Sequence, residues 1–408
     1  MEWTDEGVVL SVRPHGETAV LAEVLTREHG RHAGLVHGGR SRKLRPVLQT
    51  GNHIDVTWKA RLADQLGFFS VEPRRGFAAE IMQDGAALAG LTSMAALARL
   101  LPERDPHRPI EKETPMSLTF KKLHTNFVGE VSPVDLRSVN DAATLGAIRQ
   151  GMDEFGVLVF RDQRFSDQEH IDFAQRLDGH LHAKTGISAL QKSRLGNEAL
   201  GDISNLDENG EIMQTSDRRR MYGLANRLWH TDASFQDPPG RYSMLFARVI
   251  PPVGADTEFV DMRVAYDLLP AETKERLEGL RVHHSIAHSR QTLGFEFSEK
   301  EQEALKGVIH PLVRTMPRTG RRALYLASHA SRIVDWPLPE GRLLLRDLME
   351  HATRPELVYA HKWRVGDLVI WDNRCTMHRA TPFDDSAHRR ELRRVTTLDI
   401  DDSRTAAE

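Results

Sequence analysis

Hydrophobic and polar positions change their spacing near residue 108, which divides the chain into two dissimilar parts. Before that point, short runs that alternate apolar and polar residues are separated by glycine and charged turns, as the strands of a small sheet are. These runs span residues 7–12, 19–25, 33–36 and 54–58. Residues 83–101, rich in Ala, Leu and Met, predict a helix that breaks at Pro102. We therefore expect a small β-barrel followed by a helix within a first domain, residues 1–105.

The segment 106–115 has neither the helical nor the strand period. It contains three prolines among alternating charges, which is typical of a linker. Met116, just beyond it, could equally begin an independent protein, so a gene fusion is one interpretation of the junction. We take residues 116–402 as the second domain.

The second domain opens with a pattern of helices and one buried strand. Leu145, Ile148, Met152 and Phe155 form one helical stripe in residues 141–155, and Gly156 is placed to end that helix. Residues 157–160 predict a strand. A second helix begins at the capping-box sequence of residues 166–169, and a third follows residue 270.

Strand-like runs dominate the later part of the second domain, at residues 241–250, 323–326 and 368–371. Early helices followed by scattered strands predict a mainly β fold: a double-sheet jelly roll, or double-stranded β-helix, with flanking helices. The small barrel of the first domain would precede it.

Composition and charge indicate the cellular location of the protein more clearly than its function. The chain has 408 residues and a formal net charge of −3, so the molecule as a whole is not a binder of polyanions. The single cysteine, Cys375, excludes an internal disulfide and a cysteine-rich zinc site. No export signal and no membrane-length apolar run is visible, so we expect a cytoplasmic protein with no membrane partner.

Two histidines and one aspartate form the strongest chemical pattern. His230 and Asp232 are two residues apart, so on a strand their side chains would point to the same face and could share one metal ion. His378, from a distant strand, would be the third ligand. Two imidazoles and one carboxylate leave three positions of an iron(II) ion open, as oxygen activation requires. The alternative is a histidine that happens to lie beside a solvated carboxylate, because His-X-Asp alone is a weak pattern.

Two arginines downstream strengthen the catalytic interpretation. Arg390 and Arg394 are four residues apart, and guanidinium groups are suited to bidentate capture of carboxylates. A solvated basic run is the alternative. The β-branched residues 395–398 that follow favour a strand, on which these arginines would face inward.

Several ordered blocks give the second domain a specific resemblance. From about residue 118 to 400 the chain resembles the TauD/TfdA family of 2-oxoglutarate-dependent dioxygenases, and among them the 2,4-dichlorophenoxyacetate dioxygenases. The matching blocks are Val157-Leu-Val-Phe-Arg161, Asp202-Ile-Ser-Asn205, residues 225–235 around His230, Arg241-Tyr-Ser-Met244, Asp256-Thr-Glu-Phe259, Trp371-Asp-Asn-Arg-Cys375 and residues 389–398.

The resemblance implies a role for each matching residue. His230, Asp232 and His378 would bind iron(II) and act as the catalytic centre, with dioxygen as a co-substrate. Thr257 and Arg390 would hold 2-oxoglutarate, and Arg394 would bind the carboxylate of the substrate. The lysine that the family has before the Asp202 block is missing here, where the sequence is Arg194-Leu-Gly-Asn197. This departure leaves the identity of the substrate open.

Two further residues are weaker candidates for contact with the substrate. Lys184 could bind an anion, although a solvated lysine is the ordinary alternative. His284 falls in a segment that the family places near the pocket, and a purely structural role is the alternative.

The reaction implied by the resemblance is hydroxylation of a small acid, with conversion of 2-oxoglutarate to succinate and carbon dioxide. For an aryloxyacetate, hydroxylation between the ether oxygen and the carboxylate gives a hemiacetal, which collapses to a phenol and glyoxylate. A sulfonate of the taurine type is the alternative substrate. The sequence is compatible with a homo-oligomer.

The first domain resembles the N-terminal part of the DNA-repair protein RecO. The likeness lies in residues 3–10, 15–18, 25–30 and 38–43. It implies an oligonucleotide-binding (OB-fold) barrel on which Arg40, Arg42, Lys43 and Arg45 contact a nucleic-acid backbone weakly, with Trp58, Phe68 or Phe69 stacking on bases. A solvated loop and aromatic residues of the barrel core are the alternatives. A rival function for the whole chain is a RecO-like single-strand-binding repair protein with an idle oxygenase.

Overall fold

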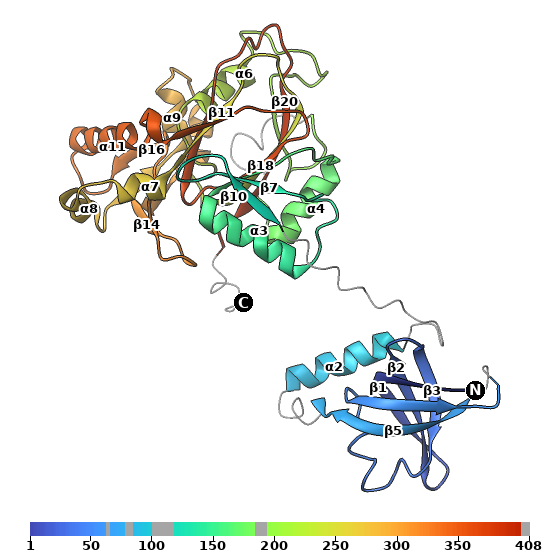
Figure 1. Cartoon of the computed structure of the whole chain (residues 1–408). Helices are drawn as coiled ribbons and strands as arrows, with labels where there is room; N and C mark the ends of the chain where they lie inside the picture. The colour runs from blue at the N-terminus through green and yellow to red at the C-terminus, as the bar shows by residue number, and fades with distance from the viewer. Residues whose placement is uncertain (63–65, 78–84, 100–117, 184–193, 401–408) are drawn as a thin grey trace. The chain divides into compact units, whose positions relative to one another are not determined.

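The computed structural model of the chain describes residues 1–62, 66–77, 85–99, 118–183 and 194–400. The chain folds into two compact units, Met1–Pro115 and Met116–Glu408, which are described separately below (Figure 1). Residues 106–115, for which the sequence predicts a linker, lie outside the described residues.

The first unit is a closed five-stranded barrel with the strand order β1-β2-β3-β5-β4. Strands β3 and β5 pair in parallel and the other neighbours are antiparallel. Strands β2, β3 and β4 alternate buried and partly buried residues, which explains the alternating sequence pattern. The elements are β1 (Glu2–His15), β2 (Ala19–Thr26), β3 (Gly30–Val36), β4 (His53–Lys59), β5 (Gly67–Arg75) and helix α2 (Gly85–Ala98).

The barrel core decides which aromatic residues are accessible. Trp58 and Phe69 are only 2% and 4% exposed and pack with the valines of β1, β2 and β4. They are core residues, so the suggestion that they stack on bases is wrong. Phe68 is 46% exposed and stacks on the imidazole of His37, with ring centroids 4.8 Å apart.

The second unit is built mainly of strands. They are β6 (Thr119–Lys122), β7 (Gly129–Ser132), β8 (Val157–Phe160), β9 (Gly201–Ser204), β10 (Gly240–Val249), β11 (Thr257–Asp261), β12 (Arg281–His284), β13 (Val308–Pro311), β14 (Val313–Thr315), β15 (Arg322–Leu324), β16 (Ala330–Ile333), β17 (Val358–His361), β18 (Leu368–Asp372), β19 (Thr376–Ala380) and β20 (Glu391–Leu398).

Two of its sheets face each other and form the predicted jelly roll. The larger has the order β6-β7-β8-β18-β10-β20-β9, and the smaller has the order β17-β11-β19. Side chains from both sheets meet in one core cluster, to which Val159 and Trp371 come from the larger sheet and Phe259 from the smaller. Smaller sheets, β13-β12-β16 and β14-β15, extend the unit.

Helices cover the outer face of the larger sheet, and this explains why β8 is apolar at every position. Leu158 and Phe160 pack with Ile148 of α3 and Phe173 of α4, while Val157 and Val159 belong to the core cluster shared with the other sheet. The helices are α3 (Ala142–Phe155), α4 (Asp167–Asp178), α6 (Arg218–Gly223), η1 (Leu224–Arg227), α7 (Met262–Asp267), α8 (Ala271–Leu277), α9 (Ile286–Gln291), α10 (Glu299–Ala304), α11 (Leu338–Ala352) and η2 (Pro355–Leu357).

The helix signals in the sequence are confirmed. Helix α3 ends at Gly156, whose φ of 69° is left-handed. Helix α4 begins with a capping box in which the Ser166 hydroxyl accepts from the Glu169 amide and the Glu169 carboxylate accepts from the Ser166 amide. Helix α8 follows Pro270 as predicted.

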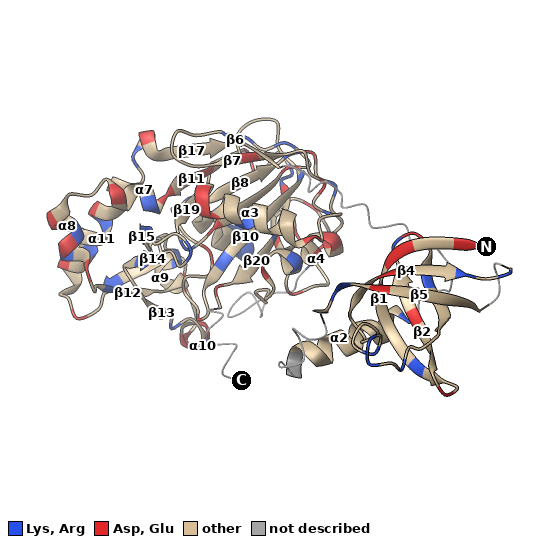
Figure 2. Ribbon diagram, turned by 60° about the horizontal axis from the view of Figure 1, so that its bottom comes forward, with Lys and Arg blue, Asp and Glu red and all other residues tan. Residues whose placement is uncertain are grey.

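Acidic and basic residues are mixed on both units of this nearly neutral chain. Figure 2 shows acidic and basic residues interspersed over the surface elements of both units. Among the described helices, none is long and apolar enough to cross a membrane.

Candidate metal centre

His230 and His378 are brought together by a short bridge between their own backbones. The His230 amide donates to the His378 carbonyl at 3.0 Å, and the His378 amide donates to the His230 carbonyl at 2.8 Å. His378 lies on β19, opposite Phe259 of β11. The residues after His230 form turns, so the expectation that His230 and Asp232 share a strand face is wrong. They converge because the chain turns immediately after the bridge.

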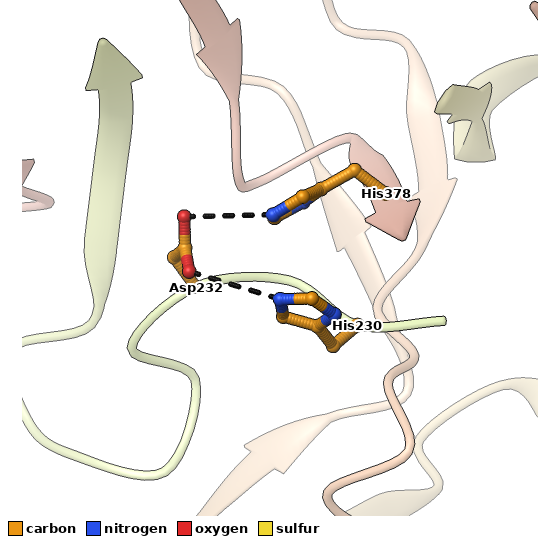
Figure 3. A group of neighbouring side chains, drawn as sticks. All are labelled: His230, Asp232 and His378. Carbon is orange, nitrogen blue, oxygen red and sulfur yellow. Dashed lines mark ion pairs between the residues drawn. The ribbon is translucent and has the colours of Figure 1, made fainter. Parts of the chain in front are cut away.

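The three side chains point toward a common centre (Figure 3). The Asp232 carboxylate faces both rings from one side: its Oδ1 is 4.0 Å from Nε2 of His230, and its Oδ2 is 3.8 Å from Nε2 of His378. One candidate ligand atom from each residue lies within 4.8 Å of the other two. All three residues are buried. Separations of this size leave room for one ion coordinated by all three groups.

A network of polar groups fixes the Asp232 carboxylate. The Ser243 hydroxyl donates to Oδ2 at 2.7 Å, and the Arg394 guanidinium donates to Oδ1 at 2.5 Å. The side-chain oxygen of Asn373 accepts from the Asp232 amide at 2.9 Å, and the Asn373 amide group donates to Ser243 at 2.9 Å. The side chain that would bind a metal is therefore held in one orientation by its neighbours.

Asn373 and Ser243 were not singled out as site residues by the sequence. Asn373 lies in the turn between β18 and β19 and also accepts from the indole of Trp371 at 3.0 Å. Its own carbonyl accepts from the Thr231 hydroxyl at 2.6 Å. The only sequence signal for them was their position inside the matching blocks, because their contacts join segments more than 100 residues apart.

The charge states of the three residues suit metal binding. Burial lowers the pKa of both His230 and His378, which keeps the imidazoles neutral with a nitrogen lone pair available. The Nδ1 atom of His230 lies 2.7 Å from the Leu228 carbonyl, so a proton there leaves Nε2 free to coordinate. Burial alone would raise the pKa of Asp232, but the Arg394 guanidinium and the hydrogen bond from Ser243 hold it below its usual value. The donor set fits iron(II).

The arginines predicted to face inward do so because of strand alternation. Arg390, Arg394 and Thr396, at every second or fourth position, line the cavity, while Val395 points into the core shared with α3 and α4. Arg389 is exposed and pairs with Glu211 at 2.9 Å. The alternative of a solvated basic run therefore holds for Arg389, but not for Arg390 or Arg394, which line the cavity.

Arg390 lacks a counter-charge in the part of the chain that the structure describes. Its side chain is 7% exposed, and no described carboxylate or carbonyl accepts from its guanidinium. Its backbone amide donates to the Asn205 side chain at 2.8 Å. Burial lowers the pKa of Arg390 to about 10. A buried cation without a partner favours an anionic ligand at this place.

Thr257 lines the same cavity from the first position of β11. It is 3% exposed, and its hydroxyl accepts from the indole of Trp363 at 3.0 Å. This leaves the Thr257 hydroxyl proton available as a donor. Both residues that the resemblance assigns to 2-oxoglutarate thus lie on the wall of the cavity that contains the three candidate ligands.

The cavity has a volume of about 440 Å³ and differs in character from one side to the other. One wall is apolar or aromatic, formed by Tyr222, Phe235, Ile286 and Leu305, which belong to or pack on one hydrophobic cluster. Arg290 and His329 line the cavity near this wall, and nothing in the sequence marked them as site residues. Other lining arginines are paired with acids: Arg194 with Asp202 and Glu391, Arg219 with Asp217 and Glu208, and Arg220 with Asp385.

The two weaker substrate candidates gain no support. His284 is fully buried and is not among the residues that line the cavity. Its Nδ1 lies 3.0 Å from the Ser234 hydroxyl and its ring stacks on Tyr325, contacts that suit the structural alternative. Lys184 lies outside the described residues.

The basic patch of the first unit is exposed. Arg40, Arg42, Lys43 and Arg45 follow β3 and all face solvent. Arg40 donates to the Glu17 carbonyl at 3.2 Å. Among the described residues, no carboxylate forms an ion pair with any of the four. Their charges are therefore available to a ligand outside the barrel.

Comparison with known proteins places the two units in different families. Residues 1–77 match the family described as recombination protein O N terminal. The DNA repair protein RecO of Methylobacterium nodulans is 58% identical over 107 residues, which are 26% of this chain and 44% of that protein. The chain thus carries a RecO-type N-terminal domain but spans less than half the length of that relative.

The second unit matches relatives over nearly their whole length. The alpha-ketoglutarate-dependent 2,4-dichlorophenoxyacetate dioxygenase of Cupriavidus pinatubonensis is 47% identical over 285 residues, 70% of this chain and 99% of that protein. The crystal structure of AAD-2 with Mn(II) and N-oxalylglycine superposes with a TM-score of 0.64 at 43% identity, covering 69% of this chain and 97% of that one. Residues 119–396 match the family described as taurine catabolism dioxygenase TauD, TfdA family. The chain therefore belongs to the TauD/TfdA family of dioxygenases.

Proposed function

We propose that this protein is an iron(II)- and 2-oxoglutarate-dependent dioxygenase of aryloxyalkanoic acids such as 2,4-dichlorophenoxyacetate. The observation that carries the proposal is the meeting, in one cavity, of the buried His230, Asp232 and His378 side chains with the buried guanidinium of Arg390, which has no acidic partner among the described residues. The apolar wall of the same cavity suits an aromatic ring.

The two histidines and Asp232 would hold iron(II), and Arg390 with Thr257 would hold the distal carboxylate of 2-oxoglutarate. Bound together with dioxygen, iron(II) and 2-oxoglutarate supply the oxidising power to hydroxylate a C–H bond while the 2-oxo acid becomes succinate and carbon dioxide. Ser243 and Asn373 fix the carboxylate orientation, and burial excludes bulk water from the reacting groups.

Arg394 and the apolar wall would position the substrate. The guanidinium of Arg394 lines the cavity beside Asp232, where it can attract the carboxylate of an entering acid. An aryl ring against Phe235, Ile286 and Leu305 would then leave the carbon between ether oxygen and carboxylate nearest the metal side. Hydroxylation of that carbon gives a hemiacetal that breaks into a phenol and glyoxylate.

The first prediction separates aryloxy acids from sulfonates. Succinate release is measured with the full chain, iron(II), 2-oxoglutarate and each of 2,4-dichlorophenoxyacetate, 2-phenoxypropionate and taurine. We expect kcat/KM for the better aryloxy acid to exceed that for taurine by at least roughly 100-fold, because taurine buries no ring against the apolar wall. Equal values, or a preference for taurine, would contradict the proposed substrate class.

A second function is favoured by the exposed cationic patch of the barrel and by the exposed ring of Phe68. We propose that the first unit binds single-stranded nucleic acid weakly through Arg40, Arg42, Lys43 and Arg45, with Phe68 as a stacking surface. This would be a separate activity of the RecO-type domain and not a step in the oxygenase reaction.

The barrel prediction is tested with the full chain and a fluorescent single-stranded oligonucleotide. Replacing Arg42, Lys43 and Arg45 together with glutamine should weaken binding at least roughly 10-fold and flatten its dependence on salt, because fewer counterions are released. Replacing Arg13, Lys59 and Arg61, exposed basic residues elsewhere on the barrel, is the matched control. Binding that is insensitive to salt, or lost equally in both variants, would argue against the patch.

A further inference from the structure

Arg290 is a buried cation on the cavity wall that neither the metal centre nor the 2-oxoglutarate position uses. It is 5% exposed and lies on α9. Its guanidinium carbon is 4.7 Å from the centre of the Tyr222 ring. One terminal nitrogen donates to the Ser289 hydroxyl at 2.9 Å, and Nε is buried without an acceptor. No described carboxylate forms an ion pair with it.

A buried guanidinium with so few acceptors is costly for the protein to keep without a ligand. Hydroxyl and aromatic contacts stabilise it less than a carboxylate would. Burial lowers the pKa of Arg290, Tyr222 and Asp232 oppose this shift, and the positive charge of Arg394 adds to it. The acid beside Arg394 is Asp232, whose Oδ1 accepts from Arg394 at 2.5 Å. Within the described ranges, no acid forms a comparable ion pair with Arg290.

The position of Arg290 matches the shape of an amphiphilic substrate. Ile286 and Arg290 are one helical turn apart on α9, and both line the cavity. Ile286 belongs to the apolar cluster that includes Leu305 and on which Phe235 packs. One helix thus presents an apolar side chain and a cation on the same wall of the cavity.

Arg290 is also connected to the metal side of the cavity. The Ser289 hydroxyl that it contacts is 2.9 Å from Nδ1 of His329. The His329 ring lies edge-on to two neighbouring rings. Its centroid is 6.0 Å from that of His230 and 5.1 Å from that of Phe235. A substrate anion held at Arg290 would therefore lie between the apolar wall and the His230 edge of the metal centre.

We propose that Arg290 is a specificity-determining residue that binds the carboxylate of the substrate together with Arg394. This inference rests on the proposed function, since it assumes that an arylalkanoic acid occupies this cavity. Arg394 attracts the carboxylate while it is paired with Asp232, and Arg290 supplies N–H donors that none of the described acids accepts. The pair would make the cavity select acids over neutral molecules of the same shape.

Arg290→Met tests this by comparing an acid with its uncharged counterpart. Binding of 2,4-dichlorophenoxyacetate and of its primary amide to the full chain with iron(II) and 2-oxoglutarate is measured by calorimetry without oxygen. We expect the Kd of the acid to rise roughly 10- to 100-fold and that of the amide to change less than about threefold. Arg290→Lys should recover part of the loss, while the Kd of 2-oxoglutarate should stay within about twofold of wild type.

The outcomes separate the inference from the proposed function. If the wild-type protein binds neither compound, the proposed substrate class is wrong. If it binds both and the variant weakens acid and amide equally, Arg290 only packs against Tyr222 and the inference is wrong. An unchanged Kd for the acid also overturns it. Arg346→Met, on the exposed surface of α11, is the matched control and should leave both constants unchanged.

Discussion

Replacing Asp232 with alanine is expected to lower succinate release by roughly 1000-fold or more. Residues that merely support a metal ligand typically contribute 10- to 100-fold to affinity or activity, and Asp232 is itself a proposed ligand. Alanine removes the single carboxylate among the three converging side chains and leaves two imidazoles. Succinate is measured at saturating 2-oxoglutarate, and bound iron per chain by metal analysis, where we expect a value near zero.

Asp232 also neutralises Arg394, so a folding defect must be separated from the loss of metal. Asp232→Asn keeps the size of the side chain and its contacts with Ser243 and Asn373 while removing the negative charge. Asp347→Ala, at an exposed position of α11, is the matched surface control. If a folded Asp232→Ala protein still binds one iron per chain and releases succinate, Asp232 is not a ligand.

The parts of the fold that the sequence predicts well depend on neighbours in the chain. The helix over 142–155 has its apolar stripe, and Gly156 ends it with a left-handed φ that costs little without a side chain. The capping box at Ser166 needs only residues within one helical turn. The alternation that continues from Arg390, immediately before β20, along that strand is equally local, and it correctly predicts that Arg390 and Arg394 share the cavity side.

The features that the sequence misses depend on long-range contacts. The segment after His230 resembles a strand in its alternation but forms turns: its bridge to His378 is an isolated one, and the Asp232 amide donates to the Asn373 side chain and not to a neighbouring strand. Asn373 is an ordinary turn residue until the fold brings it to Asp232. Arg290 lies in a short helix with little periodicity, so nothing local marks it as part of the cavity wall.

Arg390→Met is expected to have opposite effects on ligand binding and on stability. The variant loses the guanidinium proposed to bind 2-oxoglutarate, so its KM for 2-oxoglutarate should rise roughly 100-fold, as for loss of a charged bidentate contact. Without ligand, the wild-type protein keeps a buried cation that no described acid neutralises. The apo variant should therefore be at least as stable as the wild type.

The sign of the stability effect follows from the pKa of Arg390. Burial lowers it to about 10 in the folded state, which corresponds to a cost of roughly 3 kcal/mol as an upper bound. The cost is fully present below pH 10, where the group is charged in both states, and fades as the pH rises through the folded and then the unfolded pKa. Methionine removes this cost, so the free energy of unfolding at neutral pH should increase or stay constant.

Thermal melts with and without 2-oxoglutarate and a redox-inert divalent metal measure both effects at once. Ligand at 100 times its Kd stabilises the wild type by about 2.7 kcal/mol, and a 100-fold weaker Kd reduces this to about 0.4 kcal/mol. Arg389→Met is the matched control, because Arg389 is next to Arg390 in the chain but has an exposed guanidinium that pairs with Glu211. A variant that keeps the wild-type KM and ligand-induced stabilisation would show that 2-oxoglutarate is held elsewhere. A large loss of apo stability would instead show that Arg390 has a partner within the protein, which would remove the reason for expecting an anion beside it.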